Sequence, residues 1–433
     1  MSDALYLGID FGTGGVRASL IDHAGSELDW HSTAMPAPVQ VDGQWLQHAQ
    51  IWLHSLEHCL NALRANADFG RLRAIAVDGT SSSVLLCGKD GEPLCAAIMY
   101  RDSSAQAQAR QIAALAPPDS GAHGASSSLA KLLLLRRQYP KLAADHFCHQ
   151  ADFISGWLRG HYGHSDENNC LKLGYDAYHQ CWPEWLGQLD FPPHWLPEVH
   201  RPGRVMGSID RRRAAQFGIA PDCAIVAGTT DSIAAFIATG ACRRGDAVTS
   251  LGSTLVLKQL TDTPVFSAAH GVYSHRYYAA DDLWLAGGAS NCGGSVLREH
   301  FSQTQLDAMT TQLDPDTATG LDYYPLPADH IGERFPVADT TRRAQLSPRP
   351  ADDVVFFQAI LEALADIEAE GYALLQRLGA GAVQQIFSAG GGSRNTAWHR
   401  IRAQRLPCPL HRAPHTEASY GAALLARFSF TQQ

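Results

Sequence analysis

The sequence lacks the local patterns that mark a zinc site, a disulfide framework or an exported protein. Its 10 cysteines are scattered over 433 residues without a Cys-x-x-Cys pair, and its 20 histidines include no His-Glu-x-x-His spacing. Scattered cysteines in a chain without an export signal usually behave as small buried hydrophobic residues. The residues Met1–Leu5 include no basic region of the kind that opens a signal peptide. We therefore expect no transition-metal site built by the protein, and a cytoplasmic location.

Long apolar runs and an excess of positive charge are also missing. No stretch approaches the roughly 18 consecutive apolar residues that a membrane-spanning helix needs. Lysine and arginine total 34 against 43 aspartates and glutamates, which gives a net charge of −9. Proteins that neutralise nucleic-acid phosphates are normally basic. We therefore expect a protein that binds neither a membrane nor nucleic acid, and that is a monomer or a homodimer.

The composition is that of a globular protein with two or three domains, since 45% of the residues are hydrophobic and 18% are charged. Two segments half a chain apart, residues 5–21 and 247–259, share one pattern: a strand, a turn rich in glycine, serine or threonine, and another strand. This repetition predicts two related α/β lobes, covering residues 1–238 and 239–433. A last helix over 417–428 can pack back on the N-terminal lobe.

Periodicity and turn residues predict the other elements. A strand over 26–32 follows the first hairpin, and two further strands, 72–77 and 84–87, are expected to pair with each other. Residues 162–205 have no clear period. Further strands are expected at 224–227 and 386–389, and helices at 49–66, 129–137, 210–217, 233–238, 352–378 and 396–405.

The segment Asp10–Gly15 is the sharpest local signal. A strand that ends in a carboxylate and enters a Gly/Thr turn directs backbone N–H groups at phosphate oxygens, while the carboxylate holds Mg²⁺ through water. A dinucleotide-binding fingerprint fails because Arg17 stands where glycine is required, and a P-loop fails because Gly88-Lys89 continues with Asp90. From these residues alone, a phosphate-binding turn and an ordinary hairpin turn are about equally favoured.

Two further motifs carry weaker signals. The turn Gly252-Ser253-Thr254 is ordinary turn chemistry, but it resembles the first turn, and two such hairpins together grip phosphates. Asp231 stands between a buried strand and a small apolar helix, where a carboxylate serves either as a general base or as an N-cap. Taken alone, the position favours the cap.

The segments 390–395 and 78–83 also join core elements. Three consecutive glycines directly after a strand let a flat ring lie against the backbone, and Asn395 and Trp398 are candidates to complete a nucleotide-base pocket. The segment 78–83 contains a carboxylate and four hydroxyls, which suit hydrogen bonding to a polyol. A polar turn is its default interpretation.

Taken in order, these motifs resemble those of the FGGY family of carbohydrate kinases, within the actin-like (ribonuclease H-like) ATPase superfamily. The resemblance runs through almost the whole chain, from residues 7–15 and 74–87 to 332–336 and 420–423. It implies an α/β fold of two ribonuclease H-like lobes with a central interlobe cleft. It also implies phosphorylation of a sugar or polyol hydroxyl by MgATP, with the sugar on the N-terminal lobe and ATP on the C-terminal lobe.

The resemblance assigns roles by position. Asp231 matches the catalytic base. The positions that contact the sugar match Asp10, Ser81 and Asp231. Asp10 also matches the carboxylate linked to Mg²⁺ through water. At the substrate turn glycerol kinases usually show Arg-Glu and xylulose kinases Met-His, whereas Ser81 and Ser82 stand here. The ATP-binding positions implied are Gly12, Thr13, Gly14, Gly252, Ser253, Gly391, Gly392, Asn395 and Trp398.

The turn Asp-Gly-Thr-Ser-Ser-Ser-Val is similar to that of small D-ribulose kinases of cyanobacteria and plants, so D-ribulose is the expected substrate. Kinases of xylulose or of another pentulose or polyol are the alternative. The chain departs from the family in its short length, in residues 162–185, and in the absence of a recognisable aromatic signature. A nucleotide-switch module related to actin and a sugar-binding pseudokinase are rival hypotheses. The pair Asp10 and Asp231 argues against the pseudokinase.

Overall fold

The structure, a computed structural model, describes residues 3–280 and 282–431. The chain divides into two compact units. The first consists of residues 1–238 together with 415–433, and the second of residues 239–414. The last helix, α12 (Ala418–Thr431), therefore belongs to the first unit although it closes the chain.

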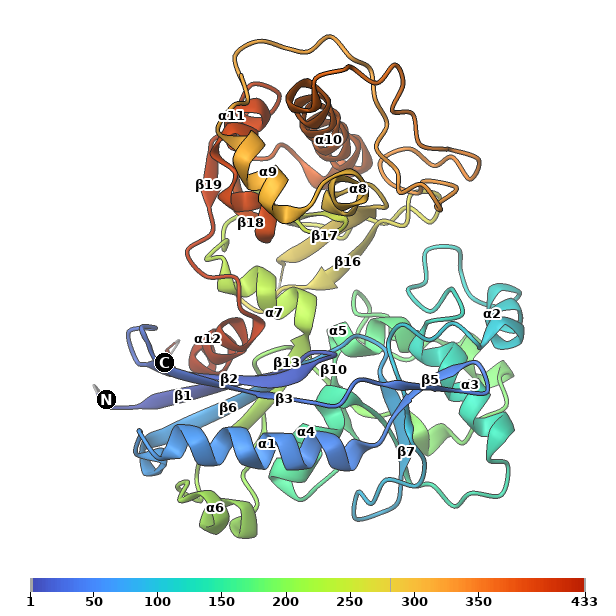
Figure 1. Cartoon of the computed structure of the whole chain (residues 1–433). Coiled ribbons are helices and arrows are strands. Elements are labelled where there is room, and N and C mark those ends of the chain that lie inside the picture. The colour runs from blue at the N-terminus through green and yellow to red at the C-terminus, as the bar shows by residue number, and fades with distance from the viewer. Residues whose placement is uncertain (1–2, 281, 432–433) are drawn as a thin grey trace. The chain divides into compact units, whose positions relative to one another are not determined.

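The main sheet of the first unit has six strands around β1 (Figure 1). Strand β1 pairs antiparallel with β2 through a tight hairpin and parallel with β6, which in turn pairs parallel with β13. Their buried side chains are mostly β-branched or aliphatic, as expected for strands covered on both faces. The order across the sheet is β12 (Val205–Ser208), β13 (Ala224–Thr230), β6 (Leu72–Gly79), β1 (Leu5–Phe11), β2 (Gly15–Asp22) and β3 (Glu27–Ala34).

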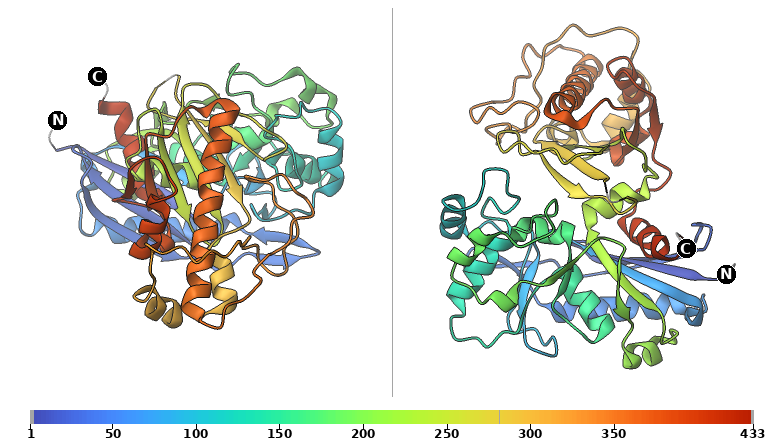
Figure 2. Two further views of the ribbon diagram at one scale, coloured as in Figure 1. Left: turned by 90° about the horizontal axis from the view of Figure 1, so that it is seen from above. Right: turned by 180° about the vertical axis from the view of Figure 1, so that it is seen from behind.

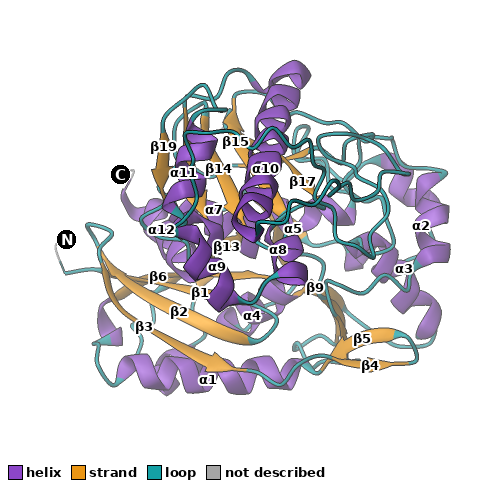
Figure 3. Ribbon diagram, turned by 45° about the horizontal axis from the view of Figure 1, so that its top comes forward, coloured by secondary structure: helices purple, strands orange, loops and turns teal. Residues whose placement is uncertain are grey.

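Helices cover both faces of this sheet (Figure 3). Helix α1 (Ala49–Arg64) and helix α4 (Gln150–Arg159) bury Trp52 and Phe153 against one face, with ring centroids 6.0 Å apart. Helix α12 packs on β1, β2 and β6 from the other face. It approaches closely because Gly8 has no side chain: a Cβ there would lie 2.0 Å from the Ser419 carbonyl oxygen.

The strands predicted at 72–77 and 84–87 exist as β6 and β7, but the prediction that they pair is wrong. Both edges of β6 are already occupied, by β1 and by β13. Strand β7 therefore leaves for a second sheet, whose order is β4 (Val39–Val41), β5 (Gln44–Gln47), β8 (Ala97–Ile98), β7 (Val84–Cys87) and β9 (His146–His149).

The segment 162–205, which gave no clear period, folds into short pieces. Strands β10 (His164–Asp166) and β11 (Glu198–His200) form a two-stranded parallel sheet. Short 3₁₀ helices cover Leu171–Leu173, Glu184–Gln188 and Pro193–Trp195, as another does at Phe69–Arg71. The remaining helices of the first unit are α2 (Gln106–Ala113), α3 (Ser128–Gln138), α5 (Glu167–Cys170), α6 (Arg211–Phe217) and α7 (Asp231–Ala238).

The second unit is built on one six-stranded sheet, across which the long helix α10 (Asp353–Leu375) lies (Figure 2). Asp352 caps α10 by accepting a hydrogen bond of 2.8 Å from the Val354 amide. A single π-helical turn, Gln376–Ala380, follows α10. The sheet order is β16 (Tyr273–Arg276), β17 (Trp284–Ser290), β15 (Leu255–Thr261), β14 (Asp246–Leu251), β18 (Gln385–Ala389) and β19 (Leu410–Arg412).

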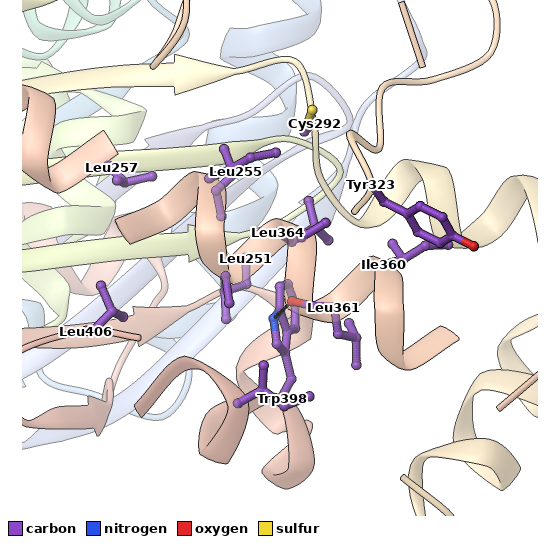
Figure 4. Close-up of a cluster of buried hydrophobic side chains, with 14 of the residues drawn as sticks. Leu251, Leu255, Leu257, Cys292, Tyr323, Ile360, Leu361, Leu364, Trp398 and Leu406 are labelled. Atoms are coloured by element: carbon purple, nitrogen blue, oxygen red, sulfur yellow. Dashed lines mark hydrogen bonds between the residues drawn. The ribbon is translucent and has the colours of Figure 1, made fainter. Parts of the chain in front are cut away.

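The core of the second unit joins this sheet to its helices (Figure 4). Leucines of β14, β15 and α10 interdigitate there, and the Trp398 ring packs among them. The other helices are α8 (Gly294–His300), α9 (Gln303–Thr310) and α11 (Thr396–Ala403), with a 3₁₀ turn at Gly391–Arg394. Among the described residues of the chain, no helix has the length and apolar character needed to cross a membrane.

The two main sheets share one topology. In each, a central strand forms a hairpin with the next strand in sequence and pairs parallel on its other side: β1 with β2 and β6, and β14 with β15 and β18. In each sheet a further strand then pairs parallel with that neighbour: β13 with β6 in the first unit and β19 with β18 in the second. The repeated strand–turn–strand pattern of the sequence therefore marks two copies of one α/β architecture.

A buried ion pair ties the second unit together, and its removal should be costly. Arg402 donates to both carboxylate oxygens of Glu368, at 2.6 and 2.7 Å, and both side chains are almost fully buried. Arg402→Met should lower the free energy of unfolding by about 3–5 kcal/mol, because an unpaired buried carboxylate remains. Urea denaturation measures this loss, and Arg402→Met combined with Glu368→Met should recover part of it.

The matched control is Arg400→Met on the same helix, which removes an exposed pair with Asp316. We expect a change below about 1 kcal/mol there. Equal losses for the two single variants would contradict the prediction.

Candidate functional site

Carboxylates gather at the carboxyl end of the main sheet of the first unit. The parallel register pairs Asp10 of β1 with Asp78 of β6, and Asp78 in turn with Thr229 of β13. Residues in register on neighbouring strands point to the same face, so the two carboxyl groups adjoin each other. Ligands of open α/β sheets bind at this end of the strands.

The charge of this pair is unusual. Asp78 is fully buried, and burial together with the neighbouring Asp10 raises its pKa well above the ordinary value. Burial also raises the pKa of Asp10 to about 6. In the described part of the chain, no amide or hydroxyl group donates to either oxygen of Asp78 or to Oδ1 of Asp10. Two carboxyls so placed share a proton unless a cation or another donor offsets their charge.

Asp231 lies at the same end of the sheet. It directly follows β13 and is the first residue of α7, so the helix starts two residues earlier than predicted. Its Oδ1 accepts a hydrogen bond of 2.6 Å from the Ser232 amide, the very next residue. The Asp231 charge contributes to the raised pKa values of Asp10 and Asp78. The fold thus brings together the carboxyl groups of residues 10 and 231, which are far apart in sequence.

The turn between β1 and β2 presents backbone donors beside Asp10. The Gly12 amide closes the hairpin by donating to the Gly15 carbonyl at 3.0 Å. The amides of Thr13 and Gly14, in contrast, donate to no group of the described residues, and both residues are at least partly exposed. A turn with free amides next to a carboxylate suits an anion such as a phosphate.

The predicted sugar turn follows β6, and most of its hydroxyls form hydrogen bonds with other groups of the protein. Thr80 and Ser83 contact each other at 2.5 Å, and Ser82 accepts a hydrogen bond from Ser128 at 3.1 Å. Ser81, which is half-buried, has no partner in the described part of the chain. Ser81 is therefore the hydroxyl of this turn that remains available to a ligand.

A buried lysine fixes the backbone of this turn. Lys131 of α3 donates to the carbonyl oxygens of Ser82, Met99 and Tyr100, at 2.8, 2.8 and 3.2 Å. Burial lowers the pKa of Lys131 to about 7. The anchored Ser82 adopts a left-handed backbone with φ of 68°, which is uncommon for serine. Sequence analysis did not single out Lys131, because no local pattern shows which backbone carbonyls a lysine on a leucine-rich helix will meet.

The second unit contains a pocket of about 700 Å³, and six of the predicted nucleotide-binding residues line it. Those residues come from the hairpin after β14, the loop after β18 and the first turn of α11. They are Gly252, Ser253, Gly391, Gly392, Asn395 and Trp398. The sizes of small-molecule and cofactor sites run from about 300 to 1,000 Å³.

The pocket wall is shaped by Trp398 and the glycine loop. The Trp398 indole N–H donates to the Leu361 carbonyl at 3.1 Å, so the ring is fixed in the core (Figure 4). A Cβ on Gly392 would lie 2.3 Å from this ring, whereas a Cβ on Gly391 would meet nothing within 4 Å. Asn395 caps α11 by accepting from the Trp398 amide at 2.9 Å. Gly391 therefore leaves open space toward a ligand, and Gly392 serves the packing.

Two arginines at this pocket were not predicted. Arg298 donates to the Ser253 hydroxyl at 2.6 Å, and Arg394 also lines the pocket. Both cations suit a ligand that carries phosphate groups. Asp78 was noted only as part of a polar turn, and its place beside Asp10 follows from strand register, which no local pattern reveals.

Comparison with known proteins identifies the family. The N-terminal domain of the FGGY family of carbohydrate kinases matches residues 5–238, and its C-terminal domain matches residues 247–430. A xylulose kinase of Staphylococcus epidermidis is 22% identical over 99% of this chain and 88% of its own length. A D-ribulokinase of Saccharomyces cerevisiae is 22% identical over 97% of this chain and 71% of its own length.

Solved structures agree with this assignment at the level of the fold. A ligand-bound xylulose kinase from Lactobacillus acidophilus superposes with a TM-score of 0.84 at 18% identity, over 99% of this chain and 90% of that one. A glycerol kinase from Plasmodium falciparum with ADP gives a TM-score of 0.86 at 16% identity, again over 99% and 90%. The predicted two-lobed, ribonuclease H-like α/β fold class is confirmed. The chain belongs to the FGGY family of carbohydrate kinases and is an ATP-dependent sugar kinase.

Proposed function

We propose that this kinase transfers the γ-phosphoryl group of ATP to the primary hydroxyl of a ketopentose, with D-ribulose as substrate and D-xylulose as the alternative. The observation that carries the proposal is the position of Asp231 beside Asp10 and Asp78 at the carboxyl end of one sheet. A carboxylate there is suited to accept a hydroxyl proton. The family match over both halves of the chain favours this function over a nucleotide switch.

The choice of sugar rests on the turn after β6. The curated relatives include several xylulose kinases and one D-ribulokinase, which supports a five-carbon ketose. The bulkier Met-His pair that is usual in xylulose kinases is replaced here by Ser81 and Ser82. With Ser82 committed to Ser128 and Lys131, Ser81 is the residue that we assign to a sugar hydroxyl. This small, polar turn favours D-ribulose over D-xylulose.

The proposed chemistry is a direct displacement at phosphorus. Asp231 accepts the proton of the sugar's primary hydroxyl, whose oxygen forms a bond to the γ-phosphorus as the bond to the β,γ-bridging oxygen breaks. The products are the sugar phosphate and ADP. We assign the backbone amides of Thr13 and Gly14 to the phosphates, since both are available, and Gly12 to the turn that positions them, since its amide closes the hairpin.

For the nucleotide, the pocket of the second unit supplies the proposed contacts. The backbone at Gly391 and the pocket wall beside Trp398 offer a flat apolar surface for the base. Gly252 and Ser253 line the same pocket, and we assign them to the phosphate groups. Arg298 and Arg394 add positive charge to it. A pocket with apolar walls and a few charged groups is typical of nucleotide sites.

The residues at the sheet end fit Mg²⁺. They offer carboxylate oxygens, the ligand type that Mg²⁺ prefers, and Oδ1 of Asp10 is buried without a donor in the described part of the chain. We assign Asp10 as the carboxylate that would hold Mg²⁺ through water. Bound there with ATP, the ion would offset the charge of the phosphates and of the buried carboxyl pair.

The function is tested by ADP release with D-ribulose, D-xylulose, ribitol and glycerol at equal concentration. We expect the highest kcat/KM with D-ribulose. Asp231→Asn keeps the oxygen that accepts from the Ser232 amide, so it should fold normally and retain ATP binding while kcat falls at least about 100-fold. Sugar-independent ADP release would contradict the kinase proposal, and near-normal turnover of the variant would contradict the base assignment.

The glycine loop gives a pair of matched variants. Gly391→Ala adds a methyl group where nothing stands within 4 Å, so stability should be unchanged while the KM for ATP rises about tenfold because the base is displaced. Gly392→Ala places its methyl group against the Trp398 ring and should lower the free energy of unfolding by about 1–3 kcal/mol. Thermal melts and ATP titrations separate the two effects. An unchanged KM for ATP in Gly391→Ala would argue against this pocket.

The carboxyl pair predicts a pH dependence of stability without Mg²⁺. A carboxyl whose pKa is raised by folding destabilises the protein as it ionises, so stability falls as the pH rises from about 4 through the folded pKa. That value is about 6 for Asp10, and burial with the neighbouring Asp10 raises the pKa of Asp78 well above its ordinary value. Asp78→Asn removes one of the two charges, so at pH 7.5 its free energy of unfolding should exceed that of the wild type by about 1–2 kcal/mol.

At pH 5 the raised pKa of Asp78 favours its neutral form, so the Asp78→Asn variant and the wild type should be nearly equal in urea denaturation. Asp90→Asn, at an exposed turn, is the control and should change neither value. A variant less stable than the wild type at pH 7.5 would contradict the prediction.

A further inference from the structure

Three side chains of metal-binding type converge on the small sheet β10–β11 of the first unit. Nδ1 of His164 lies 2.9 Å from Nε2 of His200. The carboxylate of Glu198 lies 3.7 Å from that His164 nitrogen and 3.6 Å from that His200 nitrogen. The three residues form a group of possible metal ligands whose ligand atoms all lie within 4.8 Å of one another.

The spacing of these atoms matches a coordination shell. Zinc bonds to imidazole nitrogen and carboxylate oxygen are about 2.0–2.2 Å long, so neighbouring ligand atoms in a tetrahedral shell stand roughly 3.4 Å apart. The two nitrogens lie 2.9 Å apart, and the two Glu198 oxygens lie one beside each nitrogen, Oε2 at 3.7 Å from His164 and Oε1 at 3.6 Å from His200. With one oxygen taken as the ligand, the three ligand atoms lie within 4.8 Å of one another, so one ion fits between them after small side-chain shifts.

The backbone holds the ligands in this position. Glu198 and His200 are two residues apart on β11 and so point to the same face, and the parallel register places His164 directly beside Glu198. The two imidazole rings stack with centroids 5.1 Å apart. Both histidines are partly buried while Glu198 is exposed, which leaves a path for an ion from solvent. Arg159, a buried cation of α4, donates to the carbonyl oxygens of Met206 and His161.

We propose that His164, Glu198 and His200 form a binding site for one divalent transition-metal ion of the zinc class, with water as the fourth ligand. Two neutral imidazoles and one carboxylate make a ligand set that zinc uses, and it differs from the all-oxygen sets that Mg²⁺ prefers. The proposal stands apart from the kinase assignment, because it depends only on β10 and β11. It runs against the sequence-based expectation of no transition-metal site, because His164 and Glu198 are 34 positions apart and only the pairing of two short strands brings them together.

A bound ion would hold together the two strands of the segment 162–205. Strand β10 ends at Asp166, whose side chain caps α5 by accepting from the amides of Asn168 and Asn169, at 2.9 and 3.0 Å. Asn168 then donates to the Thr229 hydroxyl at 2.9 Å, two residues before Asp231. An ion that joins β10 to β11 would therefore steady the residues that contact the end of β13, beside the start of α7 at Asp231.

The test is a calorimetric titration of Zn²⁺ into the full chain after EDTA treatment, together with thermal melts with and without Zn²⁺. We expect one tight site per chain and a melting temperature raised by Zn²⁺. His164→Gln and His200→Gln should each weaken binding at least about tenfold and abolish the thermal shift. Glu198→Gln, at an exposed side chain, should weaken binding in the same way.

Controls address the other surface groups that bind zinc. His54 and His58 stand one turn apart on α1, both exposed, with ring centroids 4.6 Å apart, and Cys181 and Cys242 are exposed thiols. His54→Gln with His58→Gln, and Cys181→Ser with Cys242→Ser, should leave the tight site intact. Absence of tight binding by the wild type, undiminished binding by Glu198→Gln and His164→Gln, or loss of the site in either control would overturn the proposal.

Discussion

The parallel pairing of β1 with β6 is the constraint on which the site depends. It sets Asp10 against Asp78 in register, with the β1–β2 turn and its available amides at the same end of the sheet. Two adjoining carboxyl groups, one of them fully buried, destabilise a folded protein that lacks a counter-charge. Helices pack both faces of the main sheet, and this packing offsets the free-energy cost of the carboxyl pair. The pair in turn gives a site for charged ligands a fixed, desolvated group of carboxylates.

The two units use one topology for different chemistry. In both sheets a hairpin turn follows the central strand, and a loop follows the parallel neighbour of that strand. In the first unit that loop follows Asp78 and Gly79 at the end of β6 and carries hydroxyls, whereas in the second it is the glycine run beside Trp398. A polar loop suits a sugar and a bare backbone suits a flat ring, so the side chains at equivalent positions, rather than the fold, distinguish the two sites.

Each loop is also held in place by a buried cation. Lys131 binds the backbone carbonyls around Ser82 in the first unit. In the second, Arg402 joins Glu368 to the Ser388 hydroxyl, two residues before the glycine loop. Buried charges need such multiple partners, and the partners in turn become fixed. The loops that we assign to ligands are thereby held by buried cations from other elements.

The sequence by itself determined the elements, the repeated hairpin and the residues of the two turns, because glycine, proline and hydrophobic period act over a few neighbours. The structure contains the strands and turns that were predicted for 5–21 and 247–259, and Gly390–Asn395 joins a strand to a helix as predicted. Only the tertiary structure decided that β6 pairs with β13 instead of β7, that Asp78 joins Asp10 and Asp231, and that His164 meets His200. These contacts join residues far apart in the chain, and strand order and register, which arise from packing both faces of a sheet, have no local signature.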